Sequence, residues 1–186
     1  MTSALAQAVA ALERAGIDYF VGGSMASIVH GEMRTTQDAD IIVRVPSGAL
    51  SSLAATLDQD FFVDGEFLAD CFAVGSSCNV IHRKTGFKID FFPLKTREFS
   101  KSEMTRASYV TTADGSRMRI ASAEDCVLAK LEWFEKGDRA SDRQWRDVLG
   151  VMKAVGPALD FAYMRRWADS LGLAELLGRA ITEAGL

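Results

Sequence analysis

Two aspartates separated by one residue lead directly into an apolar β-branched run. Asp38 and Asp40 precede Ile41, Ile42 and Val43. Such a run is typical of a strand that is buried on both faces. Alternate side chains of a strand leave on the same face, so the two carboxylates point the same way, about 6 to 7 Å apart at their Cα atoms. The sequence therefore predicts a core strand that carries a pair of acids at its start.

Like charges placed this way favour a bound cation, because their repulsion must be neutralised by a metal ion or a basic side chain. Carboxylate oxygens suit Mg²⁺, which keeps several waters and shares its shell with substrate phosphates. A third acid, Asp90, lies between Ile89 and Phe91 in another apolar alternation. An acid is costly there unless it faces the same cation or finds a partner. The alternative for Asp38 and Asp40 is a solvated strand end.

Gly22, Gly23 and Ser24 occupy a predicted strand-to-helix turn. Residues 17–21 predict a strand, and residues 25–29 combine helix formers with apolar side chains. Ser24 is placed to cap this helix. Glycine allows close backbone approach, and free N–H groups at a helix start attract an anion. A phosphate could bind here; the alternative is an ordinary tight turn with a serine cap.

The order of these features resembles the DNA polymerase β-like nucleotidyltransferase superfamily. Ser24 is followed by thirteen residues, then by Asp38-x-Asp40 on a strand, and later by an isolated Asp90 on another strand. The resemblance implies that Gly22, Gly23 and Ser24 bind a triphosphate and that Asp38 and Asp40 hold Mg²⁺. It implies that Asp90 completes the metal site or helps to deprotonate an attacking hydroxyl. Two cations about 3.5 to 4 Å apart would stabilise both the entering and the leaving oxygen.

Further segments are similar to the minimal bacterial branch of this superfamily, which includes abortive-infection toxins and antibiotic nucleotidyltransferases. They are Arg34-x-Thr36-x-Asp38-x-Asp40, residues 122–130 and residues 143–147.

Three residues of these segments have open roles. Arg34 could steady the acids or a phosphate, or be a surface charge. Lys130 could contact phosphate oxygens or hold the acids, or it could be a solvated lysine paired with Glu124 or Glu135. Asp147 could orient Lys130 or an arginine, or face water.

The resemblance implies a nucleotidyltransferase of the EC 2.7.7 type that moves a nucleoside monophosphate from an NTP to a hydroxyl and releases pyrophosphate. The acceptor could be a tRNA end, a protein or a small molecule such as an antibiotic. The alternative is a non-catalytic nucleotide-binding or interaction module of a toxin–antitoxin system, with a cognate antitoxin as partner. Which NTP is used stays open.

Composition agrees with a folded enzyme. The chain has 186 residues, 48% of them hydrophobic, which suits one domain or one domain with a small appendage. No apolar run reaches the roughly 20 residues of a membrane helix, and the first residues lack a basic signal-peptide region. We expect a cytoplasmic protein without a membrane partner.

The number and spacing of the cysteines and histidines do not indicate a zinc site. The three cysteines, Cys71, Cys78 and Cys126, form no Cys-x-x-Cys pair and are expected to be reduced and mostly buried. His30 is expected to cap or pack, and His82 is given no role.

Charge is unevenly distributed around a net value of −4. Residues 1–82 sum to −7 (3 − 10), residues 83–106 to +4 (7 − 3), and residues 107–186 to −1 (11 − 12). The basic segment could form a rim near the metal site that meets phosphates, or it could be a solvated helix face. The candidates for this rim are Lys95, Arg97, Lys101 and Arg106.

The expected fold class is α+β: a nucleotidyltransferase fold with a mixed twisted sheet flanked by helices and a C-terminal helical bundle. The catalytic domain is predicted over residues 1–120 and the helical region over residues 121–186. About four helices follow Ser122, and three tryptophans there are expected to pack in the core rather than to stack on a base. They are Trp133, Trp145 and Trp167.

Helices are predicted over 3–15, 24–30, 47–57 and about 66–74, and strands over 17–21, 39–45, 61–63, 78–82, 87–92, 109–112 and 117–120.

Overall fold

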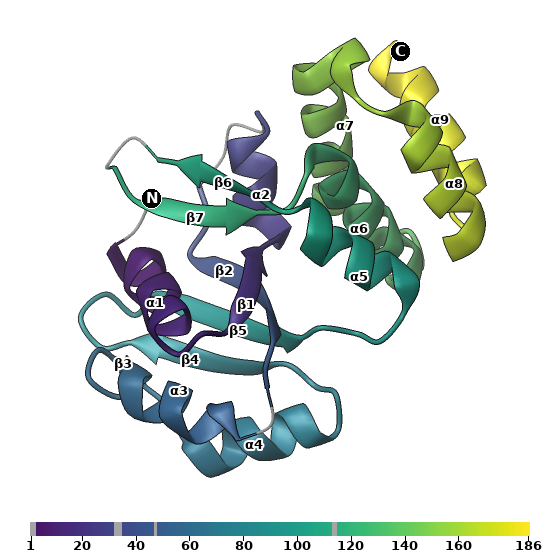
Figure 1. Cartoon of the computed structure of the whole chain (residues 1–186). Helices are drawn as coiled ribbons and strands as arrows, with labels where there is room; N and C mark the ends of the chain where they lie inside the picture. Colours follow the sequence, from purple (N-terminus) through teal and green to yellow (C-terminus); the bar gives the residue numbers. More distant parts are fainter. Residues whose placement is uncertain (1–2, 32–34, 47, 113–114) are drawn as a thin grey trace. The chain divides into compact units, whose positions relative to one another are not determined.

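A mixed β-sheet organises the first of two units into which the chain folds. The computed structural model describes residues 3–31, 35–46, 48–112 and 115–186, and within them seven strands form one sheet in the order β3-β4-β5-β2-β1-β7-β6. This unit comprises residues up to Gly22 and residues 36–120 (Figure 1). Its strands are β1 (Asp18–Val21), β2 (Asp38–Arg44), β3 (Phe61–Phe62), β4 (Cys78–His82), β5 (Lys88–Pro93), β6 (Ser108–Thr111) and β7 (Arg117–Ile120).

The two central strands are parallel, and each has one buried face. On β2, Ala39, Ile41 and Val43 are 0–1% exposed, whereas the alternate residues are half-buried. On β5, Ile89 and Phe91 are fully buried on the same side of the sheet. The expectation that β2 is buried on both faces is therefore wrong for the face that carries Asp38 and Asp40, because half-buried side chains alternate with the core residues.

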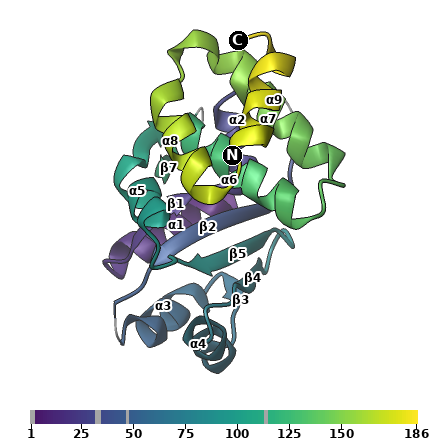
Figure 2. The ribbon, with the colours of Figure 1, turned by 90° about the vertical axis from the view of Figure 1, so that its right-hand side faces the viewer.

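Helices pack against the buried face of this sheet. They are α1 (Ser3–Arg14), α3 (Ala49–Leu57) and α4 (Gly65–Ala73), and Figure 2 shows α3 and α4 lying together on one side of strands β3, β4 and β5. The Asp64 side chain caps α4 by accepting hydrogen bonds from two backbone N–H groups, as is typical of a helix start.

The helix α5 (Glu98–Arg106) is not among the elements that the sequence pattern predicts. Its sequence has little apolar periodicity, but Phe99 and Met104 are buried and anchor it. Glu98 in the first turn and Arg106 in the last turn complement the helix dipole. The many charged residues in 83–106 interrupt the apolar periodicity, so the hydrophobic pattern alone does not predict this helix.

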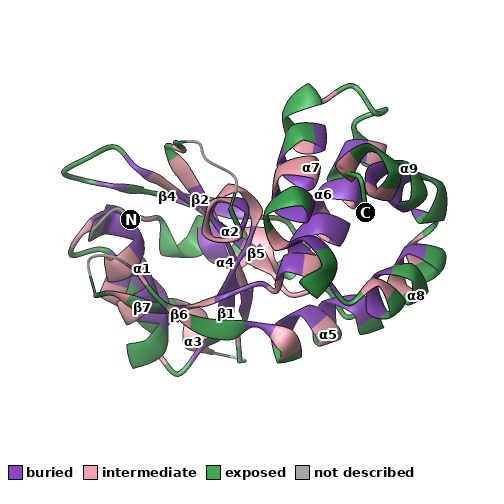
Figure 3. Ribbon diagram, turned by 90° about the horizontal axis from the view of Figure 1, so that it is seen from above, coloured by how far each residue is buried: buried purple, intermediate pink, exposed green. Residues whose placement is uncertain are grey.

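The second unit is made of helices and comprises residues 23–35 and 121–186. Residues 23–35, including α2, therefore fold with the helices rather than with the sheet, and the domain division predicted at residue 120 stays a prediction. Figure 3 shows that much of α6 is buried, and the helix ends at Lys136. The helices are α2 (Gly23–Val29), α6 (Ala123–Lys136), α7 (Asp142–Val155), α8 (Phe161–Leu171) and α9 (Ala174–Ala184), with a 3₁₀ turn at Gly156–Ala158.

Short polar contacts hold α2 against α6 within this unit. His30 Nε2 donates to the Ala121 carbonyl at 2.7 Å, and Ser27 Oγ lies 3.5 Å from Cys126 Sγ. His30 therefore makes the structural contact expected of it. Across the described ranges, no helix is both long enough and apolar enough to cross a membrane.

Gly31 gives a direct test of the packing between α2 and α7. Its φ is +115°, and a Cβ atom placed on it would lie 2.3 Å from the Ala154 Cβ. We expect Gly31→Ala to lower the free energy of unfolding by about 2–3 kcal/mol, because the methyl group has no room and the backbone is strained. Urea unfolding measures this difference.

Gly178→Ala is the matched control, because Gly178 lies in α9 and a methyl group added to it would enter open space. It should stabilise the protein by about 0.5–1 kcal/mol through helix propensity. Equal effects of the two substitutions would contradict the close approach of α2 to α7.

Candidate active site

Three carboxylates share one face of the sheet because of how β2 and β5 pair. The strands are parallel, and Asp40 is the direct partner of Asp90 while Asp38 is the partner of Lys88. Partners on adjacent strands lie about 4.8 Å apart and point to the same face, and Asp38 lies about 6–7 Å from Asp40 along β2. The pairing therefore sets Asp38, Asp40 and Asp90 on one face of the sheet.

Neighbouring side chains hold two of these acids. Thr36 Oγ1 donates to Asp38 Oδ1 at 2.5 Å, and Lys88 Nζ lies 2.7 Å from Asp90 Oδ2. Asp90 is only 17% exposed, whereas Lys88 is 43% exposed. The hydrogen bond to Asp90 is the main reason that the pKa of Lys88 lies above its ordinary value, and desolvation opposes it. The sequence pattern alone assigns Lys88 no role, although its place two residues before Asp90 puts both on one face.

A surface with fewer charges continues this face of the sheet. Asn79 on β4 is the partner of Asp90, and Ile81 is the partner of Lys88. Beyond Ile81, its partner Phe62 on β3 is 58% exposed, and the Arg83 guanidinium lies 4.3 Å from the centre of its ring. The acids are therefore flanked within this unit by an amide and by exposed apolar side chains.

The donor set fits a hard divalent cation in its chemistry, and the strand register sets the three acids on one face of the sheet. Carboxylate oxygens are the ligands that Mg²⁺ prefers. Within residues 3–31, 35–46, 48–112 and 115–186, however, no group of three or more His, Cys, Asp or Glu side chains is arranged to hold a metal ion. The contacts of Asp38 with Thr36 and of Asp90 with Lys88 direct carboxylate oxygens to other partners. A cation would require these side chains to turn.

The predicted glycine turn follows β1. The Gly22 N–H donates to the Asp40 carbonyl at 2.9 Å, so the turn is fixed to the strand that carries the acid pair. A Cβ atom on Gly22 would lie 2.9 Å from Ile42 Cδ1, so a larger residue here would require the end of the Ile42 side chain to shift. Gly23 has a φ of +52° and opens α2, so the strand-to-helix turn is confirmed. Ser24 is the second residue of α2 and does not precede the helix, so its predicted place as the cap is wrong.

Gly23 and Ser24 belong to the second unit, and Arg34 lies outside the described residues. Ser27 Oγ donates to the Gly23 carbonyl at 3.2 Å. The roles of Gly22, Gly23, Ser24 and Arg34 in phosphate binding stay predictions.

No protein-family model matches the chain, and no curated protein matches it by sequence. Solved structures match nearly all of it at low identity. The antibiotic-resistance factor ANT(2'')-Ia in solution has a TM-score of 0.56 and 13% identity, covering 95% of this chain and 96% of its own. An antigenic nucleotidyltransferase-like protein from Paracoccidioides brasiliensis has a TM-score of 0.56 and 16% identity, covering 96% and 91%. The chain has the nucleotidyltransferase fold.

A third structure with this fold is the lincosamide antibiotic adenylyltransferase LnuA bound to lincomycin. It has a TM-score of 0.54 and 14% identity, and it covers 81% of this chain and 96% of its own. The predicted α+β nucleotidyltransferase fold is confirmed. Membership of the toxin-like branch stays a prediction.

In the helical unit of this nucleotidyltransferase fold, Lys130 is buried. Its Nζ atom lies 2.6 Å from Asp147 Oδ2 and donates to Gln144 Oε1 at 3.1 Å, and its side chain is 6% exposed. Lys130 is therefore not a solvated lysine paired with Glu124 or Glu135. Asp147 is 2% exposed, so the alternative that it faces water is wrong, and it pairs with Lys130 across α6 and α7. A contact of Lys130 with phosphate stays a prediction.

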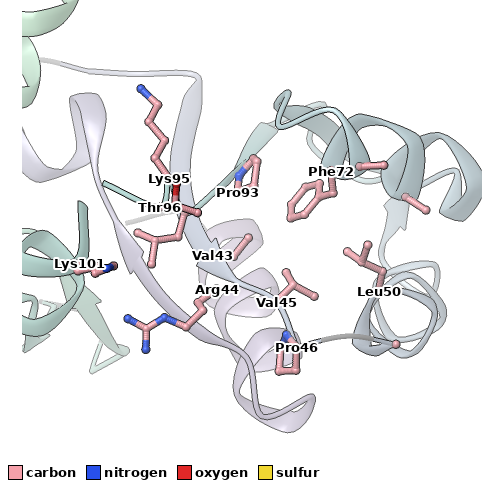
Figure 4. Close-up of a pocket in the computed structure, with 14 residues that line it drawn as sticks. Val43, Arg44, Val45, Pro46, Leu50, Phe72, Pro93, Lys95, Thr96 and Lys101 are labelled. Carbon is pink, nitrogen blue, oxygen red and sulfur yellow. The ribbon is translucent and has the colours of Figure 1, made fainter. Parts of the chain in front are cut away.

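The basic segment contributes to a pocket at the other end of β2. This pocket of about 640 Å³ is lined by Lys95 and Lys101 together with Arg44. Figure 4 shows these three side chains on one side and Phe72 and Leu50 on the other. Asp38 and Asp40 lie at the start of β2, whereas the pocket lies at its end, so these two lysines do not form the rim around the acids that the sequence suggested.

The cysteines and tryptophans do not add reactive groups. The three cysteines are free, and burial raises the pKa of the Cys78 thiol to about 11, which keeps it protonated at neutral pH. Trp145 is 9% exposed and lies in the core as expected. Trp133 is 54% exposed, with Lys136 Nζ 5.5 Å from its ring centre, so its predicted burial is wrong.

The Lys130–Asp147 pair predicts an asymmetric response to mutation. Lys130→Met should lower the free energy of unfolding by about 3–5 kcal/mol, because it leaves the Asp147 carboxylate buried without its ammonium partner. The double variant Lys130→Met with Asp147→Leu should recover most of this loss, since neither charge of this pair is then left buried without the other.

Lys136→Met is the control, because Lys136 forms an exposed pair with Glu132 and should change the stability by less than about 1 kcal/mol. Urea unfolding of all four proteins measures the differences. A single Lys130 variant as stable as the control would contradict a buried ion pair.

Proposed function

We propose that this protein is a Mg²⁺-dependent nucleotidyltransferase. It transfers a nucleoside monophosphate from an NTP to a hydroxyl acceptor and releases pyrophosphate. The observation that carries this proposal is the parallel register of β2 and β5, which sets Asp40 opposite Asp90 with Asp38 on the same face. The fold shared with known nucleotidyltransferases supports it.

Each acid has a distinct task in this proposal. Asp38 and Asp40 hold the metal through carboxylate oxygens, and Asp90 either completes the set or accepts the proton of the acceptor hydroxyl. Bound Mg²⁺ supplies Lewis-acid stabilisation of the phosphoryl oxygens. The hydroxyl oxygen forms a bond to the α-phosphorus as the bond between this phosphorus and the bridging oxygen breaks, and pyrophosphate leaves. Thr36 orients Asp38 through the hydrogen bond to its Oδ1.

The acceptor proposed is a small molecule with a free hydroxyl group. ANT(2'')-Ia is an antibiotic-resistance factor and LnuA is an antibiotic adenylyltransferase with bound lincomycin. The exposed side chains of Phe62 and Ile81 beside the acids add an apolar surface that a small acceptor could contact. A tRNA end or a protein as acceptor, and a toxin role with a cognate antitoxin, are alternatives for the same chemistry.

A second candidate is a non-catalytic nucleotide-binding or interaction module on this fold. It is favoured by one observation, that the acids of the described residues do not converge on a common point as oriented. Transfer assays separate it from the enzyme.

Replacing the acid pair should abolish transfer. With α-labelled NTPs, Mg²⁺ and separate pools of tobramycin, lincomycin and tRNA, the wild type should label one pool. Asp38→Asn with Asp40→Asn should lower the rate by about 10²-fold or more, because several kcal/mol of transition-state stabilisation are lost.

Asp18→Asn is the matched control, since Asp18 is an exposed acid of the same sheet on β1. It should leave transfer unchanged. Nucleotide binding by the wild type without transfer to any pool would favour the non-catalytic module.

A further inference from the structure

Lys88 is a basic side chain placed directly among the three acids. It lies two residues before Asp90 on β5 and opposite Asp38 on β2, so it shares their face of the sheet. Its ammonium is 2.7 Å from Asp90 Oδ2. A cation that bound both oxygens of Asp90 would have to compete with this contact.

The charges of all three acids act on this ammonium. After its hydrogen bond to Asp90, the charges of Asp90, Asp38 and Asp40 also raise the pKa of Lys88. The face therefore carries three negative charges and one positive charge, a sum of −2 (−3 + 1). A divalent cation would neutralise this sum, but a cation and an ammonium repel each other within a few ångströms.

The side chain is suited to leaving this position. Lys88 is 43% exposed, and a lysine has a flexible stem with a compact charge, in contrast to the planar fork of arginine. A partly exposed ion pair contributes only modestly to stability, so it can give way to another partner. Asp90 is much less exposed than Lys88, so its oxygen gains more from a replacement partner.

We infer that Lys88 is a positioning residue that holds Asp90 in the metal-free protein and must release it before Asp90 can bind the cation. This inference rests on the proposed function, because it assigns a metal to the same acids. Lys88 thus acts as an internal counter-ion that competes with the divalent ion. Its contact with Asp90 reduces the repulsion among the three acids when no metal is bound. The same contact lowers the affinity of the acids for the metal.

Two substitutions should shift metal affinity in opposite directions. Titration of Mn²⁺ into the nucleotide-free protein should show that Lys88→Met binds about fivefold tighter than the wild type, because the competing ammonium is gone. Lys88→Arg should bind more weakly than the wild type, because a guanidinium can hold Asp90 through two hydrogen bonds. Lys84→Met, an exposed lysine in the turn before β5, removes the same charge elsewhere and should leave the affinity unchanged.

Thermal unfolding gives a second readout, measured without metal and then with it. In EDTA, Lys88→Met should melt about 2–4 °C below the wild type, because the acids lose their counter-ion. Saturating Mn²⁺ should remove or reverse this difference, since a ligand stabilises the protein that binds it more tightly.

The outcomes separate this inference from the proposed function. If Mn²⁺ binding depends on Asp38 and Asp40 but is equal in wild type and Lys88→Met, the counter-ion role is overturned while the enzyme proposal stands. If Lys88→Met binds Mn²⁺ more tightly but the wild type transfers no nucleotide, the inference holds and the enzyme proposal fails. Absence of Mn²⁺ binding in both proteins overturns the inference.

Discussion

The parallel pairing of β2 with β5 in one register is the constraint on which the candidate site depends. Side chains alternate along a strand, so a slip of one residue would move Asp90 to the opposite face from Asp40. Burial of Ile41 on β2 and of Ile89 and Phe91 on β5 opposes such a slip, because it would expose these core residues. The buried hydrophobic face of the sheet therefore fixes the strand register, and this register in turn fixes the positions of the three acids.

Electrostatic repulsion is the cost of this arrangement, and the neighbouring side chains offset it. Thr36 satisfies an oxygen of Asp38, and Lys88 satisfies an oxygen of Asp90. The ion pair in the helical unit is more deeply buried. This pair of Lys130 and Asp147 is almost fully buried and joins two helices, whereas the acid face keeps partial exposure. A buried pair is costly to open, whereas a partly exposed pair can exchange its cation. This difference makes the Lys130–Asp147 pair the harder of the two to open and is the basis for the inference that Lys88 can be replaced at Asp90.

Local patterns predict most elements, because strands and turns here carry strong signals. The run after Asp40, the turn at Gly22 and the hairpin that ends in β7 are found within a residue or two of expectation. The helix α5 escapes prediction because its buried residues are sparse among charges. The burial of Asp147, the exposure of Trp133 and the pairing of Lys88 depend on which elements pack together, and spacing along the chain does not record this. The residue types of the site could be predicted, but the partners of those residues could not.

A crystal structure of the wild-type protein with Mn²⁺ and a non-hydrolysable NTP analogue bears on the central claim, since Mn²⁺ is located by its anomalous scattering. The account predicts an anomalous peak within ligand distance of Asp40 and at least one of Asp38 and Asp90, with Lys88 Nζ moved away from Asp90 Oδ2. An ion bound elsewhere, with the Lys88–Asp90 contact still near its present 2.7 Å, would contradict it.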